Sequence, residues 1–240
     1  MSTAKQVSEI VQPFLEQHPE FELVGRSVVM KPVRHLMRRF FIDRTSIKGY
    51  IQPSWSVSAM FGPPPKYTVS AGARMTRGVG YVERPETQVR LLEEMEVAAS
   101  EILNKADAID GLPALAWKAE PIFGPGKMTL GLSLIAKGKF TEATPYVAEM
   151  LARVEASVAQ RALALRNHRS PDSRPAQLDA YALKRSLEAQ QGLRALHEVL
   201  GASDPSAVAA LLHEWEAACA KVQKVEHLWE PSPFPFELPT

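Results

Sequence analysis

The stretch FELVGRSVVMKPVRHLMRRFFI, residues 21–42, decides the fold class of this chain. It contains short runs of β-branched and aromatic residues separated by turn residues such as Gly25 and Arg26. This pattern is typical of strands joined by tight turns. Similar runs continue to Val82, and their spacing leaves no room for helices between strands, so we expect an antiparallel sheet of about four to six strands. The predicted strands are Phe21–Val24, Ser27–Lys31, Met37–Ile42, Trp55–Phe61, Tyr67–Ala73 and Val79–Val82.

Apolar residues at helical spacing flank this region on both sides. An amphipathic helix is expected over residues 3–17, although Pro13 weakens the prediction for its second half. A longer helix is expected over residues 86–109, where one apolar stripe is bordered by acidic side chains. The rest of the chain predicts helices at 126–137, 141–168, 175–200 and 205–229.

The sequence therefore predicts an α+β fold, with an antiparallel sheet packed by helices in the N-terminal half and a helical bundle in the C-terminal half. Residues 1–111 would form the sheet domain and residues 126–240 the helical domain. The connection between them is short, so one compact unit is the alternative. The tail Pro231–Phe236 cannot be helical, and its two phenylalanines predict that it lies against the folded body.

The composition is that of an ordinary globular chain. Of its 240 residues, 45% are apolar, and the net charge is +1. The single cysteine, Cys219, excludes an internal disulfide and is expected to be a small buried side chain. The first residues lack the apolar core of a signal peptide, and no apolar run is long enough to span a membrane. We therefore expect a cytoplasmic protein with no membrane partner.

Motifs that carry chemistry are incomplete in this sequence. The segment Gly124–Met128 resembles part of a phosphate-binding loop, but Pro121 replaces its first glycine and Met128 its hydroxyl residue. The pairs His197-Glu198 and His213-Glu214 lack the second histidine of a zinc-protease helix. The sequence therefore predicts no catalytic residue, no metal site and no cofactor. It favours a non-enzymatic role and leaves a dispersed active site as an alternative.

Charge is distributed unevenly along the chain. Residues 21–85 contain eleven Lys or Arg and three acidic residues, whereas residues 86–120 contain eight acidic and three basic residues. The two segments would neutralise each other if the acidic helix packed on the sheet. Alternatively, the basic sheet binds an acidic protein surface or nucleic acid. The candidate binding residues are Arg34, Arg38, Arg39, Arg44, Lys48 and Trp55.

Strand alternation divides these candidates between two faces. It would place Arg34, Arg38 and Arg44 on one face and Arg39 on the other. Aromatic side chains such as Trp55 would offer stacking surfaces for bases, although alternate aromatic positions in strands more often belong to a core.

Two resemblances to known families add to this interpretation. The segment Leu130–Ala143, with its Leu-Gly pair, later glycine and following aromatic, resembles the first helix and turn of a tetratricopeptide unit. No second copy follows about 34 residues later, so the resemblance implies an antiparallel helix pair and not a repeat array. Residues 10–145 also resemble, in outline, uncharacterised bacterial α+β domains, some of which are immunity partners of toxins. The matching pieces are Phe14-Leu15, Phe21, Gly25-Arg26 and Gly138-Lys139-Phe140 with Ala143.

The second resemblance implies a binding protein and carries over no catalytic residue. We therefore predict a non-enzymatic protein that binds another protein, immunity-like in role. Nucleic-acid binding through the basic sheet is the first alternative and predicts steep salt dependence. An enzyme with a dispersed site is the second and predicts a pocket that contains ionisable groups. Self-association would follow if the apolar stripe of helix 205–229 were exposed.

Overall fold

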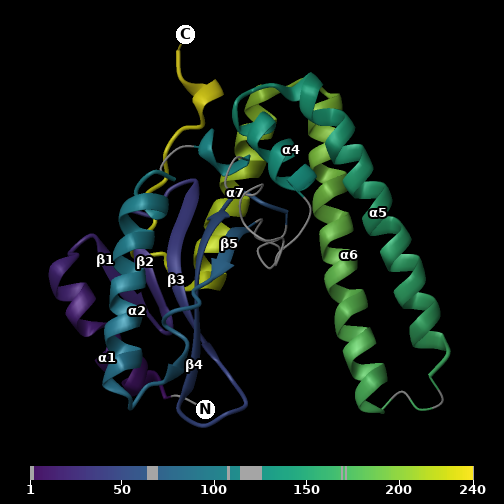
Figure 1. Ribbon diagram of the computed structural model, residues 1–240. Coiled ribbons are helices and arrows are strands. Elements are labelled where there is room, and N and C mark those ends of the chain that lie inside the picture. The colour runs from purple at the N-terminus through teal and green to yellow at the C-terminus, as the bar shows by residue number, and fades with distance from the viewer. Residues whose placement is uncertain are drawn as a thin grey trace. The chain divides into compact units, whose positions relative to one another are not determined.

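The computed structural model describes residues 3–63, 70–106, 109–113, 126–168, 170 and 172–239 (Figure 1). The predicted α+β class is confirmed. The chain forms two compact units. The sheet unit comprises Met1–Met60, Val69–Thr129 and Ala220–Ser232, and the helical unit comprises Phe61–Thr68, Leu130–Cys219 and Pro233–Thr240. The C-terminal half thus contributes to both units, and most of the predicted boundary at 111–126 lies outside the described residues.

The sheet unit contains a six-stranded antiparallel sheet. The first five strands pair in chain order, and β6 pairs with the beginning of β4, beside β5. The predicted meander is confirmed, although β4 begins at Tyr50 and not at Trp55, and residues 67–69 lie outside the described part. The strands are β1 (Phe21–Val24), β2 (Ser27–Met30), β3 (Leu36–Arg44), β4 (Tyr50–Ala59), β5 (Ser70–Arg74) and β6 (Gly80–Tyr81).

Three aromatic rings form the centre of the core on one face of this sheet. Phe40 of β3 lies opposite Trp55 of β4, on the face that α1 (Ala4–Gln17) covers through Phe14. The ring centroids of Phe14, Phe21 and Phe40 are 5.1–5.8 Å apart, and each residue is at most 4% exposed. Full burial of one such side chain contributes about 1.5–3 kcal/mol.

α1 continues through Pro13 to Gln17. Proline removes the N–H that would bond to the carbonyl of Glu9. Both residues are exposed, so water can satisfy that carbonyl. The buried face of the helix therefore stays continuous, and it consists of Val7, Ile10, Val11 and Phe14.

The acidic helix is shorter than predicted. α2 spans Pro85–Ala98 and continues as a π-helical turn, η1 (Ala99–Leu103), in place of a regular helix to residue 109. The Ser100 hydroxyl donates to the carbonyls of Glu96 at 3.0 Å and Val97 at 3.1 Å. Bonds of this kind from side chain to backbone compete with regular helical geometry, which accounts for the change at this point.

The helical unit contains two long helices that run side by side as an antiparallel hairpin, α5 (Phe140–Arg166) and α6 (Arg174–Gly201) (Figure 1). α4 (Gly126–Ala136) precedes them, and a turn at Gly138 joins α4 to α5. The end of α4, the turn at Gly138 and the start of α5 thus occupy the segment Leu130–Ala143, and the antiparallel packing expected there stays a prediction.

The last long helix, α7 (Pro205–Gln223), ends before the predicted residue 229. Lys224 takes a φ of 60°, and after a turn at residues 226–228 the chain pairs with the sheet unit at Val33; we call residues 224–232 the strap. The Val33 N–H donates to the Leu228 carbonyl and the Glu230 N–H donates to the Val33 carbonyl, both at 2.8 Å. Pairing with Val33 therefore replaces the last predicted helical turn.

The apolar stripe of α7 is buried. Its members Val208, Leu212, Trp215 and Cys219 are at most 7% exposed, and Val222 alone among the described valines of this helix is half exposed. The burial predicted for Cys219 is confirmed. Apart from Val222, the described part of the stripe lacks the exposure on which the prediction of self-association depended, and self-association stays a prediction.

The tail lies against the folded chain, as predicted. Phe234 is fully buried, with its ring centroid 5.3 Å from that of Phe61 and 4.9 Å from that of His213. A 3-10 turn, η2 (Pro235–Glu237), then places Phe236 at 5.2 Å from Phe140. Within the described residues, no helix has both the length and the apolar character needed to cross a bilayer.

His18 connects the end of α1 to α2. Its Nδ1 lies 3.1 Å from Glu20 Oε1, its Nε2 lies 2.8 Å from Glu96 Oε2, and its ring stacks on Phe14 at 4.3 Å. Burial lowers the pKa of the imidazole, but the hydrogen bonds and charges of Glu20 and Glu96 together outweigh this effect and raise the pKa above its usual value.

We expect His18 to make the stability of the sheet unit depend on pH. Because its pKa is raised in the folded state, its contribution is complete below the unfolded pKa of about 6.5 and is lost as the pH rises through the folded pKa. The thermal midpoint of His18→Gln should lie furthest below the wild type near about pH 5.5 and come closer above about pH 8. His197→Gln, at an exposed histidine of α6, is the control. A wild-type to His18→Gln difference that stays constant with pH would contradict the prediction.

Gly138 is required by its conformation and by a close neighbour. It takes a φ of +73°, and a Cβ there would lie 2.7 Å from Cβ of Phe236. We expect Gly138→Ala to lower the free energy of unfolding by about 1–2 kcal/mol, because left-handed backbone is strained for alanine. Gly201→Ala, with no neighbour within 4 Å, should be neutral or up to about 1 kcal/mol more stable. Urea titration of both variants tests this, and equal losses would count against it.

Candidate functional site

The predicted basic surface is largely engaged in contacts within the sheet unit. Arg38 donates to the Leu103 carbonyl of η1 at 3.3 Å, on the face that α1 covers. Arg39, on the opposite face, donates to Gln223 Oε1 at 2.9 Å, and its guanidinium lies 5.7 Å from the centroid of the Phe41 ring. The sheet therefore separates these two guanidiniums, as the alternation in the sequence predicts.

Arg34 lies before β3, outside the strand. It pairs with Glu230 at 3.2 Å, and both side chains are 59% exposed. Arg34 pairs with Glu230, and Arg39 bonds to Gln223. Glu230 and Gln223 lie on either side of the segment that pairs with Val33. Two of the predicted binding arginines thus hold the strap that follows α7.

The other candidates do not gather beside them. Trp55 is half-buried opposite Phe40 and Ala73, on the core face of the sheet. Lys48 is exposed in the connection between β3 and β4. Arg44 is the last residue of β3, and its side chain lies outside the described part of the structure.

The acidic helix neutralises part of the basic sheet unit. Glu93 pairs with Arg77 at 2.9 Å. The Glu94 carboxylate accepts the backbone N–H groups of Thr76, Arg77 and Gly78 at 2.8–3.0 Å. These contacts support the interpretation that the two oppositely charged segments complement each other.

A different surface lies on the α5–α6 hairpin. The two helices contain 27 and 28 residues, about 40 Å each at 1.5 Å per residue. We call residues 151–166 of α5 and 174–187 of α6 the distal arm. In the described part of this arm, only Ala176 and Ser186 are buried. Larger apolar residues along the seam, such as Val154 and Leu165, are half-buried.

Several large apolar side chains of the distal arm are exposed to solvent. Four of them are between 46% and 60% exposed, namely Leu163, Leu178, Tyr181 and Leu187. A pair of helices shares one seam, so its sides are covered only when further helices pack against it. The distal arm is thus a helical surface without a covering layer of its own.

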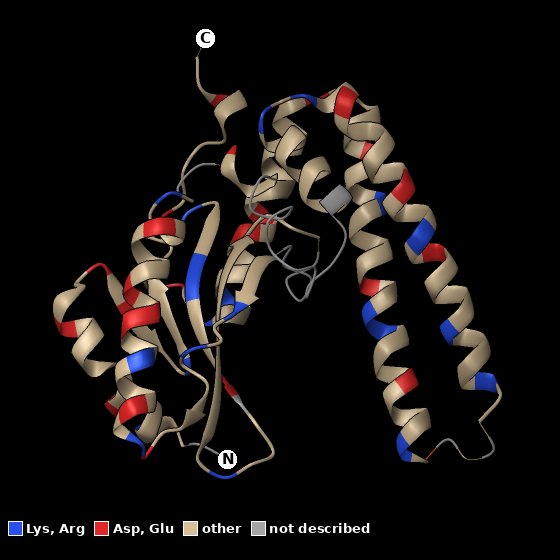
Figure 2. Cartoon of the chain, in the orientation of Figure 1, with Lys and Arg blue, Asp and Glu red and all other residues tan. Residues whose placement is uncertain are grey.

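Polar contacts fix the two helices of the hairpin against each other. Arg194 donates to Glu155 at 2.8 Å, and this hydrogen bond lowers the pKa of the Glu155 carboxyl below its usual value. Near the tip, His168 Nε2 lies 2.7 Å from Asp179 Oδ2. Acidic and basic side chains are interspersed along both helices (Figure 2), with three of each on α5 and three acidic and four basic on α6. The distal arm itself carries six of the basic residues and two of the acidic ones.

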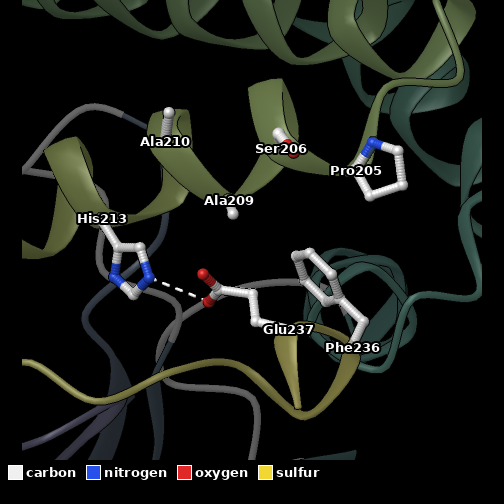
Figure 3. Close-up of a pocket in the computed structure, with 7 residues that line it drawn as sticks. All are labelled: Pro205, Ser206, Ala209, Ala210, His213, Phe236 and Glu237. Atoms are coloured by element: carbon white, nitrogen blue, oxygen red, sulfur yellow. Dashed lines mark hydrogen bonds and ion pairs between the residues drawn. The ribbon is translucent and has the colours of Figure 1, made fainter. Parts of the chain in front are cut away.

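The helical unit also contains a pocket of about 460 Å³ between α7 and η2 (Figure 3). One wall is a face of α7, and the other is formed by Phe236 and Glu237. At its edge, His213 Nε2 lies 2.9 Å from Glu237 Oε2 and His213 Nδ1 lies 3.1 Å from Glu216 Oε2. The α7 wall consists of Pro205, Ser206, Ala209, Ala210 and His213.

Sequence reasoning did not find this pocket or the distal arm. It treated His213 only as part of a His-Glu pair, whereas the structure joins it to Glu216 and Glu237. The spacing of His213 and Glu216 on one helix could have predicted their contact. The contact of His213 with Glu237 could not be predicted, because the two residues lie 24 positions apart. Among the described residues, no group of three His, Cys, Asp or Glu side chains has the arrangement of a metal site. The segment that resembles part of a phosphate-binding loop is mostly outside the described part, namely residues 124 and 125 and the side chain of Lys127.

Comparisons with protein-family models, with curated proteins and with solved structures each find no match for this chain.

We expect the arginines of the sheet to differ in their effect on stability. Arg39→Ala leaves Gln223 without its guanidinium partner at a half-buried position, so the free energy of unfolding should fall by about 1–3 kcal/mol. Arg34→Ala removes an exposed ion pair and should cost less than about 1 kcal/mol. Chemical denaturation of both variants checks this order, and a larger loss for Arg34→Ala would show that the structural role of Arg39 is wrongly assigned.

Proposed function

We propose that this chain is a non-enzymatic binding protein whose distal arm docks a protein partner. The observation that carries the proposal is the set of exposed apolar side chains on two long helices that no other described element of the helical unit buries. Apolar surface of this kind, bordered by charged residues, is typical of protein-binding faces.

The exposed apolar side chains of the arm favour a protein partner over nucleic acid, because nucleic acid is bound mainly through Lys and Arg that neutralise phosphates. The distal arm itself carries six basic and two acidic residues (Figure 2), so its apolar side chains have a net basic border. Basic charges around apolar anchors complement an acidic border around an apolar face. The occupant we propose is therefore a protein that presents an apolar helical face bordered by acidic residues.

A toxin domain is one class of such a partner. It follows from the resemblance of residues 10–145 to immunity-type domains. On this proposal the protein would act by covering its partner, and no bond would be made or broken. The engagement of Arg38 and Arg39 in internal contacts removes much of the support for binding nucleic acid on the sheet.

We expect substitution of the arm to abolish capture of the partner. The variant Leu163→Gln/Leu178→Gln/Tyr181→Gln changes only exposed residues, so its stability should change by less than about 1 kcal/mol. Affinity capture from lysate of the native host, with nuclease present, should recover a protein with the wild type and lose it with this variant.

The matched control is Val89→Gln/Val97→Gln on α2, where the valines are 55% and 51% exposed. It removes exposed apolar surface elsewhere and should retain the partner. Equal retention by the arm variant and the wild type would contradict docking at the arm. A retained species that disappears with nuclease would instead favour the nucleic-acid alternative.

A further inference from the structure

We propose that the pocket between α7 and η2 binds a cationic group, an ammonium or guanidinium carried on an apolar stem. This site is separate from the distal arm, and the inference does not depend on the docking proposed for that arm. Its volume of about 460 Å³ lies within the range of small-ligand sites, roughly 300–1,000 Å³.

The carboxylate of Glu237 is held in a defined position. Its Oε2 accepts the Phe234 N–H at 2.7 Å and faces His213 Nε2 at 2.9 Å. His213 is in turn held by Glu216, whose side chain is fully buried. Since Phe234 is itself buried, the backbone that carries Glu237 is fixed as well. A charged group held in this way binds a ligand without losing much freedom of its own.

One oxygen of this carboxylate remains available. Both hydrogen bonds of Glu237 are made through Oε2, and its side chain is 28% exposed. Figure 3 shows Oε1 directed toward the turn of α7 that carries Ala209. A carboxylate oxygen in this position is an acceptor for a charged N–H donor, and such hydrogen bonds are stronger than neutral ones.

The remaining walls suit the stem of such a ligand. Ala209 and Ala210 have small side chains that leave the space open, and the ring of Phe236 forms the facing wall (Figure 3). An aromatic face attracts cations as well as apolar groups. Among the described residues that line the pocket there is no Lys or Arg.

An anionic ligand is disfavoured at the same place. The pocket includes the first turn of α7, and helix N-termini attract anions through their free N–H groups. Here the Asp204 carboxylate already accepts the N–H groups of Ser206 at 2.9 Å and Ala207 at 3.2 Å. Together with Glu216 and Glu237, this cap leaves acidic groups in excess around the pocket.

The test titrates the full-length protein with n-butylguanidinium and with n-butylurea, a neutral molecule of the same shape, and follows binding by two-dimensional NMR. The cation should bind with a Kd of about 1 mM or tighter and shift the amide signals of Ala209, Ala210 and Glu237. The urea should bind at least roughly tenfold more weakly. Equal binding of n-butylguanidinium and n-butylurea, or shifts centred elsewhere, would overturn the proposal.

Two pairs of variants assign the effect to the pocket. Glu237→Gln keeps the size of the side chain and should weaken n-butylguanidinium binding roughly tenfold, whereas Glu214→Gln, an equal charge change at an exposed position of α7, should not. Ala210→Leu should block the pocket, whereas Ala217→Leu on the same helix should bind as the wild type does. Unchanged signals of Phe61 and Phe140, whose rings contact Phe234 and Phe236, confirm in the free variants that η2 remains in place. If Glu237→Gln and Ala210→Leu both bind normally, the proposal is wrong.

A second titration, with a peptide, shows whether the natural cation belongs to a protein or to a small molecule. The blocked peptide acetyl-Gly-Gly-Arg-Gly-Gly-amide presents the same group as part of a chain. Tighter binding of the peptide than of n-butylguanidinium would identify the ligand as a basic side chain of a protein. Binding of the free cation alone would identify it as a small molecule. Both outcomes support a cation pocket, and failure of both ligands to bind overturns it.

Discussion

Two backbone hydrogen bonds at Val33 fix the position of the segment that follows α7. Val33 is fully buried, and its N–H and carbonyl are satisfied by Leu228 and Glu230. Leaving either group unpaired would cost about 1–3 kcal/mol, so the strap after α7 is strongly held. The contacts of Arg34 and Arg39 lie at its two ends. Beyond the strap the chain continues to Phe234, whose burial positions η2 and one wall of the pocket.

The charged residues of the sheet unit show why counting charges is a weak guide to function. A guanidinium carries five N–H donors, and each has to be solvated or bonded. In this fold Arg38 bonds to a carbonyl of η1, and Arg39 bonds to a side chain near the end of α7. Each partner lies far away in the sequence. Arg38 and Arg39 are therefore neighbours in the sequence but make structural contacts on opposite faces of the sheet.

The two binding features of the helical unit differ in physical character. The distal arm is wide, exposes apolar side chains and is net basic, so it favours a partner that buries a large area. The pocket is small, and its acceptor is held in place by a chain of hydrogen bonds from Glu216 through His213 to Glu237. At the distal arm, the buried apolar area would supply the free energy of binding. In the pocket, the fixed carboxylate of Glu237 would select cationic ligands.

Local sequence patterns were enough to predict the fold class, the antiparallel strands and most helices, because strand alternation, helical spacing and turn residues act over a few neighbouring positions. They also predicted that Cys219 would be buried and that the tail with its two phenylalanines would lie against the folded chain, since apolar side chains leave water. The π-helical turn after Ala98 was missed, although the Ser100 hydrogen bonds beside it are local. The end of α7 at Gln223 and the position of Glu237 beside His213 depend on the tertiary structure, because each rests on hydrogen bonds between residues far apart in the chain or on packing that outweighs the local helical preference.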